Sequence, residues 1–319
     1  HLITVLATGD KDGDGMADFP AVKDLHAGVV TVNMGVGGIP NVPTCMRNAD
    51  FGDDGVMINA PRVTGGTCAA SYPRFLTFMA GTTSPTMFAT DFTCLARTGT
   101  MGCGFEQQLD APLKALLPGS AGPIFYAGTT GHGDDPATNG GFLRSDSLIV
   151  IFEITDEDDC STDQTDIWNP SSSTHTGDLN LRCINYFDQL YPISRFVDGF
   201  KSLRPTNPNL VIFATITGVP EDLVDLSGGA TTVNYDHLFA DPRMQNTIMT
   251  VGGTQSLTPA CTETGRGNAA PGIRMAKVAQ GFGENGVVQS ICAADYGPAL
   301  NIIISKIANA LGNVCLPRK

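Results

Sequence analysis

The sequence has few basic residues and no long apolar segment. Of its 319 residues, 19 are Lys or Arg and 32 are Asp or Glu, which gives a formal net charge of −13. Nucleic acids and anionic membrane surfaces are bound by basic patches, so we expect neither as a partner. No apolar run reaches the roughly 20 residues that a membrane-spanning helix needs, so we expect no membrane span. The acidic excess instead favours cations as ligands.

Several motifs of catalysis and zinc binding are also absent. The chain contains no C-x-x-C, no G-x-S-x-G and no H-E-x-x-H. These absences argue against common zinc clusters, a hydrolase nucleophile elbow and a zincin protease. The five histidines are dispersed and form no recognisable triad. The many acidic residues still allow a hydrolase that works with a pair of carboxylates.

Nine dispersed cysteines indicate an oxidising compartment, and we predict that the protein is secreted or displayed on a cell surface. Sequence alone leaves the connectivity open. Local pairing predicts the disulfides Cys45–Cys68, Cys94–Cys103, Cys160–Cys183 and Cys261–Cys292. The ninth cysteine, Cys315, would then be a free buried thiol or would pair with a cysteine outside this chain.

The clearest motif is DKDGDGMAD, at residues 10–18, where carboxylates fall at alternate or near-alternate positions. Alternation lets a tight loop direct successive side chains at one centre, and D-x-D-x-D-G opens the calcium loop of an EF-hand. The twelfth loop position is Ala21 rather than Glu, so no helix-loop-helix unit is implied. The alternative is an acidic turn exposed to solvent. We predict that Ca2+ is bound by the side chains of Asp10, Asp12, Asp14 and Asp18 and the carbonyl of Met16.

Apolar strands alternate with amphipathic helices along most of the chain. We expect strands at 25–34, 74–79, 148–155, 210–216 and 286–291, and helices at 1–7, 105–117, 193–203, 273–282 and 293–311. This alternation predicts an α/β fold, a doubly wound and mostly parallel sheet with helices on both faces. No repeat or linker is visible, so we treat residues 1–319 as a single domain with long, disulfide-bearing loop insertions.

Two segments could carry chemistry at the carboxyl edge of such a sheet, where ligands bind. The strand at 148–155 runs directly into Asp156-Glu157-Asp158-Asp159, whose charges would repel one another without a cation. Asp156 is best placed to face the crevice. The Gly-rich turn at 98–104 precedes the predicted helix at 105–117 and offers the hydroxyl of Thr100. The alternative for Asp156 is an acidic loop exposed to solvent. The alternative for Thr100 is that it caps the helix.

The order of these segments resembles the von Willebrand factor A domain, and more narrowly the form of that domain in uncharacterised secreted bacterial proteins. The resemblance extends over nearly the whole chain. It rests on the stretches GDKDGDGMADFPAVKDLHAGVV, GCGFEQQLDAPLKAL, ITDEDDCS, LYPISRFVDGFKSLRP and GVVQSICAADYGPAL. It implies a metal-ion-dependent adhesion site in which Thr100 and Asp156 help to bind Mg2+ or Ca2+.

The D-x-S-x-S segment that follows the first strand of that family is not present in this chain. We therefore expect one of two situations. Either the strand is supplied as a separate piece, such as a cleaved N-terminal segment, or the adhesion-type metal site is incomplete.

Together these features predict a secreted calcium-binding domain that binds or adheres to an extracellular protein or a surface polymer. One alternative is a secreted hydrolase with an acidic crevice near Asp156, which a pairing of Asp156 or Glu157 with His132 would favour. Another is a structural subunit of a surface assembly, whose sheet is completed by a neighbouring chain. The segment DFGDDG, at residues 50–55, is a weaker candidate for a second calcium site.

Overall fold

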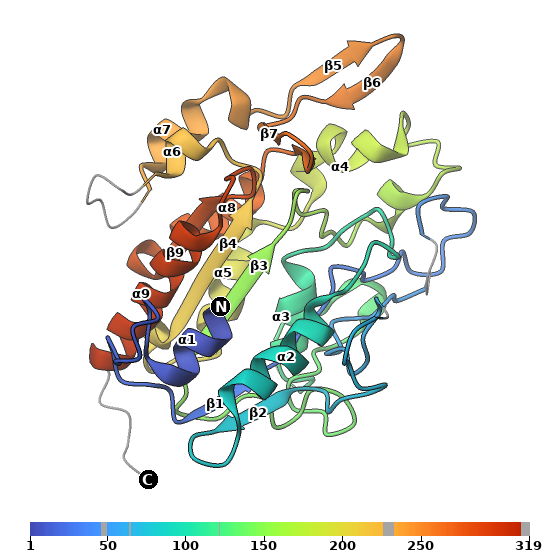
Figure 1. Ribbon diagram of the computed structural model, residues 1–319. Coiled ribbons are helices and arrows are strands. Elements are labelled where there is room, and N and C mark those ends of the chain that lie inside the picture. The colour runs from blue at the N-terminus through green and yellow to red at the C-terminus, as the bar shows by residue number, and fades with distance from the viewer. Residues whose placement is uncertain (46–49, 64, 121, 226–232, 314–319) are drawn as a thin grey trace.

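The computed structural model describes residues 1–45, 50–63, 65–120, 122–225 and 233–313 (Figure 1). The strands are β1 (Asp24–Ala27), β2 (Leu76–Met79), β3 (Ile149–Ile154), β4 (Val211–Thr217), β5 (Ile248–Val251), β6 (Thr254–Leu257), β7 (Cys261–Glu263), β8 (Gly267–Ala269) and β9 (Gly286–Ser290). The helices are α1 (Leu2–Thr8), α2 (Pro85–Ala96), α3 (Asp110–Leu116), α4 (Arg182–Asn185), α5 (Ile193–Lys201), α6 (Glu221–Val224), α7 (Tyr235–Ala240), α8 (Ile273–Gly281) and α9 (Gly297–Asn313).

A parallel sheet of three strands, in the order β3-β4-β9, lies at the centre of the fold (Figure 1). Ile149 lies opposite Val211, and Phe213 lies opposite Gly286. Every residue of β4 is buried, as expected for the middle strand of a parallel sheet covered on both faces. The apolar run at 210–216 therefore predicted this strand correctly, although its central position in the sheet was not predicted.

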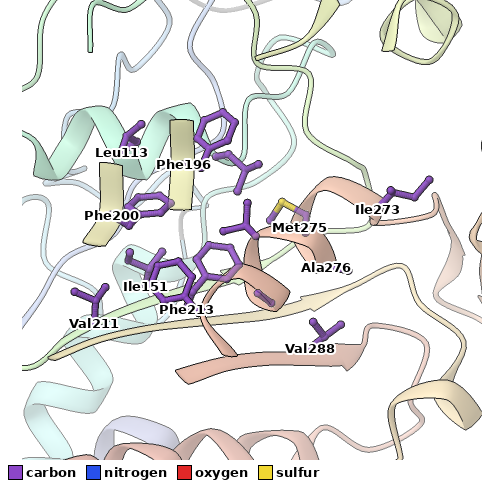
Figure 2. Close-up of a cluster of buried hydrophobic side chains, with 14 of the residues drawn as sticks. Leu113, Ile151, Phe196, Phe200, Val211, Phe213, Ile273, Met275, Ala276 and Val288 are labelled. Carbon is purple, nitrogen blue, oxygen red and sulfur yellow. The ribbon is translucent and has the colours of Figure 1, made fainter. Parts of the chain in front are cut away.

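One face of the sheet packs against α3, α5 and α8. Figure 2 shows Leu113 of α3, Phe196 of α5 and Met275 of α8 clustered over the sheet. Phe213, from β4, lies in this cluster with its ring centroid 5.7 Å from that of Phe282. Burying each such side chain contributes about 1.5–3 kcal/mol relative to leaving it exposed.

The opposite face of the sheet packs against α1 and α9. Ile212 and Val287 of the sheet contact Leu6 of α1 and Ile303 and Ile307 of α9 in a second apolar cluster. Successive side chains of a strand point to opposite faces, so β4 supplies both clusters. The central sheet thus has helices on both faces, as the alternation of strands and helices predicted.

The sequence prediction was wrong for the segment at 25–34. Only Asp24–Ala27 is a strand, and it pairs with β2 in an antiparallel ribbon outside the central sheet. Beyond it the backbone bonds to irregular loops, because Val29 accepts from Ile58 N and Val32 accepts from Gln107 N. The two further antiparallel pairs, β5-β6 and β7-β8, were not predicted, since these strands are short and largely exposed.

Four disulfides link the loops. Cys160–Cys183 and Cys261–Cys292 confirm the local pairing, whereas Cys45–Cys68 and Cys94–Cys103 are wrong. The observed pairs are Cys45–Cys103 and Cys68–Cys94. The reason is that α2 carries Cys94 back to the preceding loop, while Cys45 and Cys103 form an antiparallel bridge. Cys315 lies outside the described residues. Four disulfides are consistent with an oxidising compartment.

No helix in the described part of the chain is long and apolar enough to cross a membrane.

Candidate functional site

The loop that follows β3 and the segment that precedes α3 lie side by side at the carboxyl edge of the sheet. Cys160 N donates to the carbonyl of Glu106 at 2.8 Å. Leu109 N donates to Asp159 Oδ1 at 2.9 Å. These bonds join two segments that are about fifty residues apart in sequence, and they bring two groups of acidic residues together.

Gln108 connects the two segments through its side chain. Its Nε2 donates to Glu106 Oε2 at 2.9 Å and to Thr155 Oγ1 at 3.1 Å. The side chain is buried, and its Oε1 has no hydrogen-bond partner among the described residues. Buried polar atoms usually have partners, so this oxygen marks a place where polar groups gather without enough donors.

The carboxylates of Glu106, Asp156 and Glu157 lie near enough at this edge to interact electrostatically, although their oxygens are not all within 4.8 Å of one another. Burial, and then repulsion by Glu157 and Asp156, raises the pKa of Glu106 to about 7. Partial desolvation and the charge of Asp156 also raise the pKa of Glu157. None of the three forms a salt bridge with any residue that the structure describes. The group therefore lacks a compensating protein cation.

The next two acidic residues have structural partners. Asp159 has a fully buried carboxylate that pairs with Arg274 Nε at 3.0 Å. Asp158 accepts the backbone N–H of Arg274 at the start of α8, and burial raises the pKa of this carboxyl to about 7. Asp158 and Asp159 therefore attach the loop to α8, while Asp156 and Glu157 are left for another partner.

The two predicted residues of the adhesion-type site, Asp156 and Thr100, lie in different exposed loops. Asp156 lies two residues beyond the end of β3 and is exposed. Thr100 is exposed in the preceding loop and forms no hydrogen bond within the described residues. The fold also brings Glu106 close enough to Asp156 for the charge of Asp156 to raise the pKa of Glu106.

Sequence reasoning did not single out Glu106. The predicted helix at 105–117 would have placed it in the first turn, but α3 begins only at Asp110. Residues 105–109 instead run irregularly along the edge of the sheet. The available signal was a single carboxylate directly after a Gly-rich turn, in the stretch Gly-Cys-Gly-Phe-Glu.

The acidic loop near the N-terminus forms a second candidate site. Carboxylate oxygens of Asp10, Asp12 and Asp18 all lie within 4.8 Å of one another. Hard cations such as Ca2+ bind carboxylate oxygens in flexible loops, so this donor set suits Ca2+. Gly13 and Gly15 have φ values of 82° and 88°, which glycine adopts without strain and which tighten the turn.

Hydrogen bonds within the acidic loop organise the same carboxylates. Asp10 accepts the N–H groups of Gly13 and Gly15, at 2.7 and 2.9 Å. Asp14 accepts Met16 N at 2.7 Å and is not one of the three clustered residues, and the Met16 side chain is 70% exposed. The predicted ligands are thus brought together in part, through Asp10, Asp12 and Asp18.

No family model, no curated protein and no solved structure matches this chain.

The geometry around His132 bears on the catalytic alternative. His132 Nε2 lies 2.9 Å from Asp54 Oδ2, and the backbone N–H of His132 donates to the carbonyl of Lys114. The pairing that would have favoured a hydrolase, between His132 and Asp156 or Glu157, is therefore replaced by a contact with Asp54. Asp54 itself belongs to the DFGDDG segment that was the weaker calcium candidate.

Proposed function

We propose that this protein is a secreted, divalent-cation-binding domain that attaches to an extracellular protein or a surface polymer. One observation carries the proposal, namely the group of three carboxylates at the sheet edge without a protein cation. The cost of holding Glu106, Asp156 and Glu157 together falls sharply when Ca2+ or Mg2+ binds between them. Burial is the first cause of the raised pKa of Glu106, and the charges of Glu157 and Asp156 add to it.

The proposed cation would draw in Glu106, Asp156 and Glu157 as oxygen ligands, because in the structure their oxygens do not all lie within 4.8 Å of one another. Both Ca2+ and Mg2+ bind through carboxylates and complete their coordination with water. Asp156 and Glu157 are exposed, so a water ligand on this side could be exchanged for a carboxylate of a binding partner. This arrangement agrees with the adhesion-type role implied by the resemblance to the von Willebrand factor A domain. In this proposal Glu106 is the metal ligand in place of Thr100.

We assign a structural role to the Asp10–Asp18 loop. A Ca2+ ion held by Asp10, Asp12 and Asp18 would rigidify the connection between α1 and β1. Lys11 within the loop donates to Ser305 of α9 at 2.9 Å, so the loop is already attached to a helix that covers the sheet. The ion would stabilise this side of the fold rather than contact a partner.

Calcium and magnesium titration by isothermal calorimetry tests both assignments. The wild-type chain is expected to bind at two sites. Glu106→Gln should remove one site and leave the other, and Asp12→Asn should do the reverse. Glu221→Gln, at the exposed start of α6, is the matched control and should retain both sites. Wild-type protein that binds neither ion would refute the proposal.

A second function, as a subunit of a surface assembly, is favoured by the free edge of β3. Within the described residues β3 pairs with β4 alone. Thr155 N bonds to Ile216 O in β4, so by alternation the backbone groups of Val150 and Phe152 point to the free edge. Edge strands are normally protected by charges, proline or bulges, and the apolar sequence of β3 offers little of this.

A strand from another chain, or from a separate piece of this protein, would complete that edge. Val150→Pro removes an outward N–H but none of the bonds to β4, so it should abolish a strand-mediated complex. Val150→Ala is the control for the lost side chain. Light scattering across a concentration series measures the assembly, and a monomer at every concentration would count against this second function.

A further inference from the structure

Lys114, on α3, has a completely buried ammonium group. Its side chain is 0% exposed, and Nζ lies 2.5 Å from Asp54 Oδ1 and 2.6 Å from Thr129 Oγ1. The ring of Phe125 lies over it, with the centroid 5.5 Å from Nζ. Removal from water lowers the pKa of Lys114 against the opposing effect of the Asp54 carboxylate, and this shift makes the nucleophilic neutral amine more accessible.

The backbone holds Asp54 tightly against α3. Asp54 has a φ of 57°, a left-handed conformation that is uncommon outside glycine. At Gly55 an added Cβ would lie 2.8 Å from the carbonyl oxygen of Ala111, so only glycine permits this approach to the helix. Asn139 Nδ2 donates both to Gly55 O and to Ala115 O, which fixes the turn to α3.

The second oxygen of the Asp54 carboxylate faces His132. The Nε2 to Oδ2 distance is 2.9 Å. The side chains of Asp54 and His132 are 23% and 18% exposed, so this end of the cluster has access to solvent. An amine, a carboxyl group and an imidazole are thus arranged in series, from the buried end to the open end.

We propose that Lys114 and Asp54 form an intramolecular isopeptide bond. Nζ of Lys114 attacks Cγ of Asp54, the bond from Cγ to Oδ2 breaks, and Oδ2 leaves as water. The ammonium group loses two protons and the departing oxygen gains two, and His132 Nε2 lies where it can donate a proton to Oδ2. The overall change is an ammonium and a carboxylate becoming an amide and water, so no further reagent is needed.

Two features of the structure favour this condensation over a lasting ion pair. Reacting groups held in contact have effective concentrations of about 10⁵–10⁸ M in well-oriented systems. A buried ion pair also carries a large desolvation cost, which an uncharged amide avoids. The bond would tie the turn at residues 53–55 covalently to α3, in addition to the four disulfides.

Peptide mapping of the reduced and alkylated full-length chain tests this directly. The intact mass should be lower by one water molecule than the mass calculated for the alkylated sequence. Trypsin should then release residues 48–62 linked to residues 98–144, because a modified Lys114 is not cleaved. An unlinked 98–114 peptide as the main product would overturn the proposal.

Loss of water has another common source in Asp-Gly sequences, namely a succinimide ring at Asp54-Gly55. A succinimide leaves trypsin cleavage at Lys114 intact and joins no peptides, so the digest separates the two. Lys114→Arg retains the charge but cannot form the amide, and should have its full sequence mass. Lys306→Arg, which alters a partly exposed lysine paired with Glu284, should keep the deficit. A deficit that survives Lys114→Arg would refute the assignment, and the wild-type digest decides the question if that variant does not fold.

Discussion

Glu106→Gln should change the stability of this protein in opposite directions with and without divalent cations. The wild-type carboxyl has a pKa of about 7 in the folded protein and 4.5 as its ordinary value. Between these values the folded state binds more protons than the unfolded state, so stability falls as the pH rises through this window. Gln carries no charge, so the stability of the variant does not fall with pH for this reason. Its amide oxygen can still accept a hydrogen bond from Gln108.

The pKa difference sets the size of the effect. At about 1.36 kcal/mol for each pKa unit, the interval from 4.5 to 7 corresponds to about 3 kcal/mol at most. Glu106 keeps part of its surface in water, so we expect roughly 2 kcal/mol after screening. In EDTA near pH 8, the variant should therefore be more stable than the wild type by about this amount, and near pH 4.5 the two should be alike.

Urea unfolding with the disulfides intact measures these differences. Adding Ca2+ or Mg2+ at the higher pH should stabilise the wild type and reduce or reverse the advantage of the variant, because bound ligand stabilises only the folded state that holds it. Glu221→Gln controls for the loss of one acidic charge. A variant that is less stable than the wild type in EDTA near pH 8, or a difference independent of pH, would refute the electrostatic reasoning.

Three further predictions concern the fold. Phe213→Ala should lower the free energy of unfolding by ~3–5 kcal/mol in urea titration, because Phe213 is fully buried in the core. Arg274→Ala should cost a similar ~3–5 kcal/mol in the same assay, because it leaves the buried charge of Asp159 without its partner. Cys68→Ser should leave Cys94 as the newly free thiol in alkylation and peptide mapping under non-reducing conditions.

Each of these experiments has its own control. Phe51→Ala removes a ring that is 38% exposed and should cost far less than the core substitution. Adding Asp159→Asn to the Arg274 variant should recover part of the lost stability, and a further loss would contradict the unpaired-charge explanation. If Cys45 rather than Cys94 became free in the Cys68 variant, the Cys68–Cys94 disulfide would be contradicted. The Cys45–Cys68 pair expected from sequence proximity would then be correct.

The central strands and their helices were predictable because their signals are local. β4 is apolar at nearly every position, and burial on both faces of a parallel sheet demands this. The helix predicted at 193–203 matches α5, whose apolar residues recur at helical spacing and face the core. The spacing of apolar residues indicates which side chains are buried, and it does so without reference to the segment that packs against them.

The sequence patterns gave wrong predictions where the backbone forms hydrogen bonds with segments distant in sequence. The apolar run at 25–34 reads as a strand, but after Ala27 its carbonyls accept from Ile58 and Gln107 rather than from a sheet. The predicted helix at 105–117 starts at Asp110 because the residues before it bond to the loop after β3. In both cases tertiary contacts outweighed a weak local preference.

The sequence by itself determined the acidic loop, because Asp10, Asp12 and Asp18 are near neighbours and two glycines fold them into one turn. Local spacing is enough when all the donors lie within nine residues. The approach of Glu106 to Asp156, and of Lys114 to Asp54, was decided only by the tertiary structure. These partners are fifty and sixty residues apart, and their proximity depends on how α3 packs between the sheet edge and the 53–55 turn.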